Sequence, residues 1–184
     1  MIDVIIICVF ALRIFAGRKA GIWSEFVGVI GACVAIFTTL HYYSGLAKFF
    51  KSVYLIKTFP VEMIAVIVIF GSVMFLFYIL QEAWGAVFRL EIPGTINKRV
   101  GLVLATGNAF LLSALIFFSI IAIKDSAAVK LAQRSYSKKI FSRIALNIYS
   151  TGYEYIIKRI FPAEEANAQA YVAVDRLVAM DSDV

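Results

Sequence analysis

Three carboxylates interrupt the apolar stretches of this sequence and are the first candidates for chemistry. Asp3, Glu25 and Glu62 each lie within four residues of the start of such a stretch. A carboxylate in the first turn of a helix meets the positive end of the helix dipole, so a structural role suffices for each. An ionisable group well inside a membrane span would instead be a functional candidate. For Glu62 we favour the structural role.

The sequence contains few other residues that support catalysis. The single histidine, His41, precedes Tyr42 and Tyr43 at the end of an apolar run, which is typical of an aromatic belt at the headgroup level, with a proton relay as the alternative. There is no phosphate-binding G-x-x-x-x-G-K-[ST] loop, no H-E-x-x-H motif and no G-x-S-x-G elbow. Cys8 and Cys33 lie inside apolar runs and match packing residues. We expect no enzyme, no metal and no cofactor.

The composition is that of a membrane protein. Hydrophobic residues make up 62% of the chain and charged residues 16%, against roughly 45–50% and 25% in soluble domains. The mean hydropathy is +0.88. The net charge is +6, and the basic residues flank apolar segments, so we expect contact with anionic lipid and not with nucleic acid.

Four apolar segments predict the fold. They cover residues 2–16, 22–43, 60–80 and 101–123. About 20 residues are needed to cross the hydrocarbon core, so the first is short and the others reach the length. Backbone groups in lipid must be satisfied internally, which requires helices. The first twelve residues contain no Lys or Arg, which disfavours a signal peptide. The sequence predicts an all-α, multi-pass protein with four transmembrane helices, forming a module over residues 1–123.

The connections and the remaining residues have a different character. Residues 17–21 (GRKAG) predict a tight turn, and residues 44–59 mix lysines with aromatic residues, as in a helix that lies in the membrane interface. Residues 124–184 predict an amphipathic helical tail. Its first helix ends at Phe161–Pro162, and a second, more acidic helix covers about 163–180 and packs on the first, with disorder as the alternative for the last twenty residues.

Small residues predict where helices approach closely, because helix association in lipid depends on close packing. The fourth segment carries them at four-residue spacing, and the first two segments carry several glycines. Packing inside one bundle is the simpler interpretation, and contact with a second copy is the alternative. The residues are Gly17, Gly21, Gly28, Gly31, Gly101, Ala105, Ala109 and Ser113.

The charge distribution gives two opposing indications of orientation. The basic residues after the fourth segment favour a cytoplasmic C-terminus. The first hairpin favours the reverse, because its N-terminal flank has no basic side chain while Arg18 and Lys19 lie at the turn.

The order of these features resembles the colicin V production protein family of the bacterial inner membrane. Members open the first helix with an Ile-Asp pair, here Ile2-Asp3, and the second with Gly-x-x-x-Glu, here Gly21 and Glu25. Small residues and closing tyrosines follow in the second helix. The fourth helix keeps its four-residue spacing, but the chain departs from the family with Asn97 for an acid and Asn108 for a basic residue. The resemblance covers about residues 1–125.

The resemblance implies a role in colicin V production or secretion, or more broadly in envelope homeostasis, without catalytic activity. We expect a non-enzymatic inner-membrane module that acts through the bilayer, other membrane proteins or a second copy. Some relatives carry an extracytoplasmic protease after the last helix, which implies periplasmic termini. The polar candidates are Asp3, Arg18, Lys19 and Glu25. The alternative is a small oligomeric channel or transporter in which Glu25 is the coupling or gating carboxylate.

Overall fold

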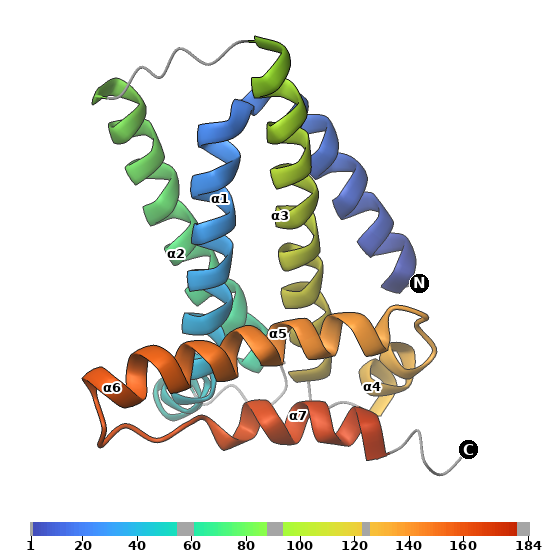
Figure 1. Ribbon diagram of the computed structural model, residues 1–184. Helices are drawn as coiled ribbons and strands as arrows, with labels where there is room; N and C mark the ends of the chain where they lie inside the picture. Colours follow the sequence, from blue (N-terminus) through green and yellow to red (C-terminus); the bar gives the residue numbers. More distant parts are fainter. Residues whose placement is uncertain (1, 55–60, 88–93, 123–125, 180–184) are drawn as a thin grey trace.

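The computed structural model describes residues 2–54, 61–87, 94–122 and 126–179, and all regular structure in these ranges is helical (Figure 1). Three long helices form a bundle: α1 (Ile2–Tyr54), α2 (Val61–Val87) and α3 (Gly94–Ala122). The shorter elements that follow are α4 (Ser126–Gln133), α5 (Lys138–Gly152), the π-helical turn η1 (Tyr153–Ile157), α6 (Lys158–Ile160) and α7 (Ala168–Ala179).

Helix α1 is two antiparallel helices joined at a single residue. Gly21 has φ 76° and ψ 171°, and the chain reverses direction there (Figure 1). Glycine adopts a positive φ without a steric penalty. The observed turn is shorter than the predicted one over residues 17–21, because residues 17–20 remain helical. We call residues 2–20 the first half of α1 and residues 22–54 the second half.

A side chain from α3 caps the second half of α1. The backbone N–H of Ile22 donates to Oδ1 of Asn97 over 2.7 Å. The first N–H groups of a helix have no partner within it, so Asn97 satisfies one of them from a neighbouring helix. This bond fixes the turn against the start of α3.

Three stretches are long and apolar enough to cross a membrane. They are Gly21–Val53, Val61–Ala83 and Ile96–Ala122, and they overlap the predicted segments at 22–43, 60–80 and 101–123. The first continues to Val53, into residues 44–59, where a separate interfacial helix was predicted. The predicted segment at 2–16 is helical but is not one of these three. The chain is thus a multi-pass membrane protein. Gly21–Val53 has 33 residues, about 50 Å of helix, which exceeds the roughly 30 Å hydrocarbon core.

The bundle is built around α3, which lies between the two halves of α1 (Figure 1). Ala105 and Ala109 of α3 are fully buried. Gly17 packs on Ala105, and an added Cβ at Gly101 would lie 3.1 Å from the backbone of Gly21. Small residues thus let the three helical segments approach closely within one chain.

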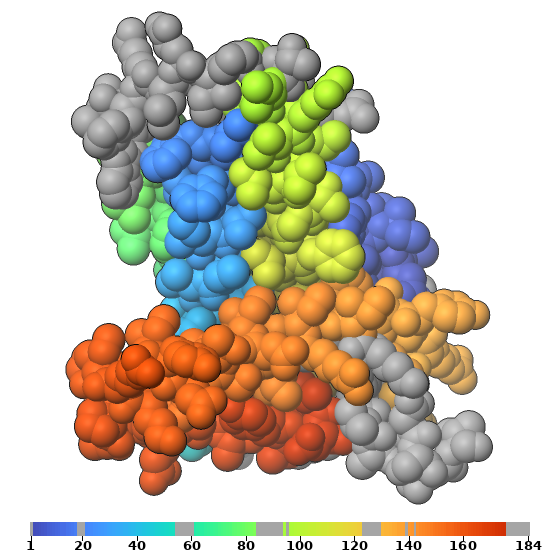
Figure 2. All heavy atoms as spheres, in the orientation of Figure 1, coloured from blue at the N-terminus to red at the C-terminus, as the bar shows by residue number. Residues whose placement is uncertain are grey.

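The short helices form a layer across one end of the bundle. Helices α5 and α7 lie side by side beneath it, at the end where the N-terminus also lies (Figures 1 and 2). Tyr149 of α5 and Phe117 and Phe118 of α3 are completely buried there. We call residues 126–179 the tail layer.

The tail layer differs from the prediction in one respect. Helix α7 begins at Ala168 instead of near residue 163, so residues 161–167 form a connection that supplies Glu164 and Asn167 to contacts with the bundle. The apolar side of α7 is buried at Ala170, Ala173 and Val174.

Candidate functional site

The carboxylate of Glu25 is buried in the bundle and paired with an arginine. Glu25 is 2% exposed, and its Oε2 accepts a hydrogen bond of 2.8 Å from Nη2 of Arg13. Nδ2 of Asn108 lies 3.5 Å from the same oxygen. The three side chains come from the two halves of α1 and from α3, so one polar cluster joins all three segments. An ion pair and hydrogen bonding together offset the penalty of burying a charge.

The turn at Gly21 brings the side chains of Arg13 and Glu25 within reach of each other. Arg13 lies eight residues before Gly21 and Glu25 four residues after it, about 12 and 6 Å along their helices at 1.5 Å per residue. The long arginine side chain spans the difference. Gly28 leaves room for Asn108, because a Cβ there would lie 2.7 Å from Nδ2 of Asn108.

A groove of about 250 Å³ opens beside this cluster. Arg13, Glu25 and Asn108 line it, together with Ser24 and Gln81. Nε2 of Gln81 donates to Oγ of Ser24 over 2.6 Å, which ties α2 to the second half of α1. Arg13 keeps 30% of its side-chain surface exposed, whereas Asn108 is completely buried. The groove thus presents a charged and hydrogen-bonding floor among apolar helices.

The other predicted polar residues lie elsewhere. Oδ1 of Asp3 accepts hydrogen bonds of 2.7 Å from the hydroxyls of Ser135 and Ser137, so Asp3 ties the N-terminus to the turn between α4 and α5. The side chains of Arg18 and Lys19 lie outside the part of the chain that the structure describes. Glu62 is paired with Nζ of Lys51 at 2.6 Å.

The remaining predicted packing residues occupy close contacts or buried positions. A Cβ at Gly31 would lie 2.8 Å from the ring of Phe77, which brings α2 against α1. Ser113 is completely buried, and its hydroxyl has no hydrogen-bond partner among the described residues.

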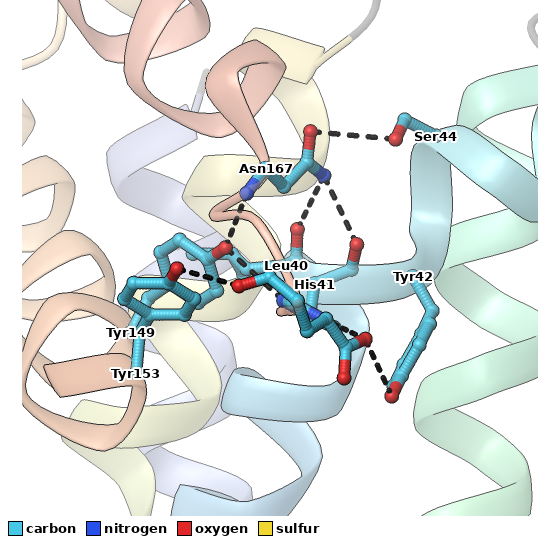
Figure 3. A network of polar contacts seen from close by, with 8 residues as sticks. Leu40, His41, Tyr42, Ser44, Tyr149, Tyr153 and Asn167 are labelled. Atoms are coloured by element: carbon cyan, nitrogen blue, oxygen red, sulfur yellow. Dashed lines mark hydrogen bonds and ion pairs between the residues drawn. The ribbon is translucent and has the colours of Figure 1, made fainter. Parts of the chain in front are cut away.

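A second polar network joins α1 to the tail layer, and its centre is His41 (Figure 3). Nε2 of His41 lies 2.7 Å from Oε1 of Glu164, and Nδ1 lies 3.2 Å from the hydroxyl of Tyr149. A tautomer with hydrogen on Nε2 satisfies both contacts, because Tyr149 then donates to Nδ1. The hydroxyl of Tyr153 donates to the backbone oxygen of Glu164 over 2.8 Å. His41 is therefore buried under the tail layer instead of facing headgroups as an aromatic belt would.

Asn167 extends this network to the backbone of α1. Its Nδ2 donates to the carbonyl oxygens of Leu40 and His41, over 2.7 and 3.2 Å. Its own N–H donates to the hydroxyl of Tyr149 over 2.6 Å, and Ser44 donates to its Oδ1 over 3.3 Å (Figure 3). Burial raises the pKa of Tyr149 to about 12, partly offset by the hydrogen bond from Asn167. The hydroxyl therefore stays protonated and donates at neutral pH.

Sequence reasoning missed the partners in both clusters. Arg13 had a signal, because it is the single charged residue between Asp3 and Arg18 and must find a counter-charge within a hairpin. Glu164 and Asn167 had no such signal, since more than 120 residues separate them from His41 along the chain. No group of three or more His, Cys, Asp or Glu residues able to hold a metal occurs in the described ranges.

Comparison with known proteins gives one match. The family model described as colicin V production protein matches residues 2–146. No curated protein and no solved structure matches the chain.

Proposed function

The chain belongs to the colicin V production protein family, and from this premise we propose that it is a non-enzymatic inner-membrane module. It supports colicin V production or secretion, or more broadly envelope homeostasis, through partners that dock on its tail layer. The observation that carries the proposal is the His41–Glu164–Asn167 network, which mounts the tail layer rigidly on the end of the bundle. A surface that is held in a fixed position is better suited to binding a partner protein than to catalysing a reaction.

The exposed side of the tail layer has the residues of a docking surface. Apolar side chains project from it beside basic ones, and Arg159 lies 5.9 Å from the ring centre of Tyr155. Exposed aromatic and basic residues suit both anionic headgroups and protein partners. Five large apolar residues are exposed between the start of α5 and the residue after α6. They are Ile140, Tyr155, Ile156, Ile160 and Phe161.

The first half of α1 supplies the fourth membrane segment in this proposal. Its outer side exposes large apolar residues, among them Ile7 at 66%, Leu12 at 70% and Phe15 at 66%. Such a surface is stable in contact with acyl chains. An even number of segments places the N-terminus and the tail layer on the same side of the membrane. The basic turn of the first hairpin favours the cytoplasm for the turn, and so the periplasm for the N-terminus and the tail layer.

The test is complementation of colicin V export in cells that lack the chain. We expect Ile156→Asp to abolish export while the protein stays in the membrane at normal abundance. Leu76→Asn on the outer side of α2, where Leu76 is 55% exposed, is the control for a general effect of added polarity. Full export by Ile156→Asp would overturn docking on this surface. Turnover of a substrate by the purified protein in liposomes would overturn the non-enzymatic assignment.

A channel or transporter is the second candidate, because the groove beside Glu25 contains a charged pair among apolar helices. Glu25→Gln removes the charge and keeps the shape of the side chain. If the protein is a channel or transporter, Glu25→Gln should reduce the ion flux into liposomes. Equal flux for both proteins removes the support for a coupling carboxylate.

A further inference from the structure

Two grooves on the same side of the bundle meet at one arginine. Arg13 lines both the polar groove beside Glu25 and an apolar groove of about 380 Å³. The apolar groove lies between the first half of α1, α2 and α3. Its lining is almost entirely aliphatic and aromatic, and includes Leu12, Val66, Ile67, Phe70 and Leu115.

The pair of grooves runs along much of the bundle. Val66, in the apolar part, and Gln81, in the polar part, are fifteen residues apart on α2, which is about 22 Å of helix. Gln81 lies two residues from the end of the span Val61–Ala83 and Val66 five residues from its start, so the polar part is near one headgroup level and the apolar part extends past the middle of the span. From that headgroup level the order is polar then apolar, which suits the headgroup and one acyl chain of a lipid.

Arg13 has hydrogen-bonding capacity that the described residues leave unused. It makes one hydrogen bond among them, from Nη2 to Glu25, and its buried Nε has no partner there. An arginine carries five N–H donors. Because 30% of the Arg13 side chain stays exposed, the N–H groups that Glu25 does not occupy can donate to an acceptor oxygen in the grooves.

From these observations we propose that the joined grooves bind one membrane phospholipid. Its ester or phosphate oxygens accept hydrogen bonds from Arg13, and one acyl chain lies along Ile67, Phe70 and Leu115. Glu25 neutralises Arg13 and holds the guanidinium in place, so the headgroup is recognised by hydrogen bonds more than by net charge. This binding site is independent of the role of the tail layer in export.

The test is lipid retention by the full chain. The protein is reconstituted in vesicles of phosphatidylethanolamine and phosphatidylglycerol, extracted into detergent and weighed by native mass spectrometry. We expect one phospholipid per chain. Ile67→Trp fills the apolar groove and removes the bound mass. Ile79→Trp is the matched control, since Ile79 is on the same helix and similarly exposed, at 46% against 56%, but is not part of the groove lining.

A charge-neutral double variant tests the headgroup contact. Arg13→Gln with Glu25→Gln keeps a polar pair and the net charge but removes the guanidinium. We expect retention about tenfold lower, the effect of losing one hydrogen bond to a charged group. Helical circular dichroism and a monodisperse elution profile show that each variant is folded.

Four results would overturn the proposal. Retention of no lipid by the unsubstituted chain, or equal retention by Ile67→Trp and Ile79→Trp, removes the groove as the binding site. Unchanged retention by the double variant removes Arg13 as the headgroup contact. A dimer that Ile67→Trp converts to monomer assigns the groove to a second copy of the chain instead.

Discussion

Nε2 of His41 lies 2.7 Å from Oε1 of Glu164, and this contact joins two residues 123 positions apart in the chain. His41 belongs to a helix of the bundle and Glu164 to the connection before α7. Tyr42 adds a 3.4 Å hydrogen bond to the same carboxylate oxygen. One acidic side chain of the tail layer therefore contacts two neighbouring residues of α1.

Glu164→Ala should loosen the tail layer. A hydrogen bond to a charged group contributes about 1.5–3 kcal/mol, so we expect amide exchange in α7 to accelerate at least about tenfold. Hydrogen exchange followed by mass spectrometry measures this. Glu165→Ala is the control, because Glu165 is also acidic and is exposed. Equal exchange in both variants would mean that the other contacts of the layer, among them those of Asn167 and Asp3, hold it without Glu164.

Alkaline pH should release the same layer. The pKa of Tyr149 is about 12 in the folded protein, against its ordinary value of 10.0. A raised pKa means that the protonated phenol is favoured by the fold, so this stabilisation is complete below pH 10 and is lost as pH rises toward 12. Tyrosinate absorbance and circular dichroism should therefore change together in this window. In Tyr149→Phe the tyrosinate absorbance and the circular dichroism should no longer change together. In Tyr136→Phe, a substitution at a residue that is 97% exposed, they should still do so.

Glu25→Gln should destabilise the bundle by leaving Arg13 without a counter-charge. The loss is on the order of 2 kcal/mol, below the roughly 3–5 kcal/mol of a fully buried pair, because 30% of the Arg13 side chain is exposed. Equilibrium unfolding in mild detergent measures it. Combining Glu25→Gln with Arg13→Gln should recover part of the loss, and simple additivity of the two substitutions would show that the pair does not interact.

Gly21→Ala should destabilise the turn within α1. An L side chain at φ 76° and ψ 171° lies in a backbone region that almost only glycine adopts and costs about 1–3 kcal/mol. Gly71→Ala gives a control of opposite sign, because a Cβ there meets no atom within 4 Å and alanine in a helix interior gains roughly 0.5–1 kcal/mol over glycine. Thermal unfolding of the two variants compares them. A stabilised Gly21→Ala protein would mean that residue 21 is not at a positive φ.

Asn97→Ala should weaken the cap on the second half of α1. Loss of an N-cap acceptor costs about 1 kcal/mol, and the effect should appear as faster exchange of the Ile22 amide. Asn97→Asp retains the acceptor oxygen and should retain the protection. If both variants exchange alike, the amide is protected by packing and not by the hydrogen bond to Asn97.

The sequence was sufficient for three of the four predicted membrane segments and insufficient for the side-chain partners. Three apolar segments were found because about 20 apolar residues in succession have few other interpretations. The buried position of Glu25 was not foreseen, because the dipole argument requires only a first-turn location and does not say which side faces α3. The hairpin brings Arg13 to Glu25, and spacing along a single sequence does not show which basic residue lies opposite a carboxylate.

The tail layer shows the same limit. The stripe of Ala170, Ala173 and Val174 follows from helical periodicity, and all three are buried. The contacts of Asn167 with the carbonyl groups of Leu40 and His41 do not follow from it, since an exposed polar residue and a buried hydrogen-bonding one look alike in a single sequence.

The reversal at Gly21 takes one residue, whereas the opposite end of the bundle carries the whole tail layer (Figure 1). Among the described residues, the two ends of the bundle consequently offer very different amounts of accessible chain. At the Gly21 end, the two halves of α1 expose little more than a bend in a helix, which leaves antibodies and proteases little backbone to bind between them.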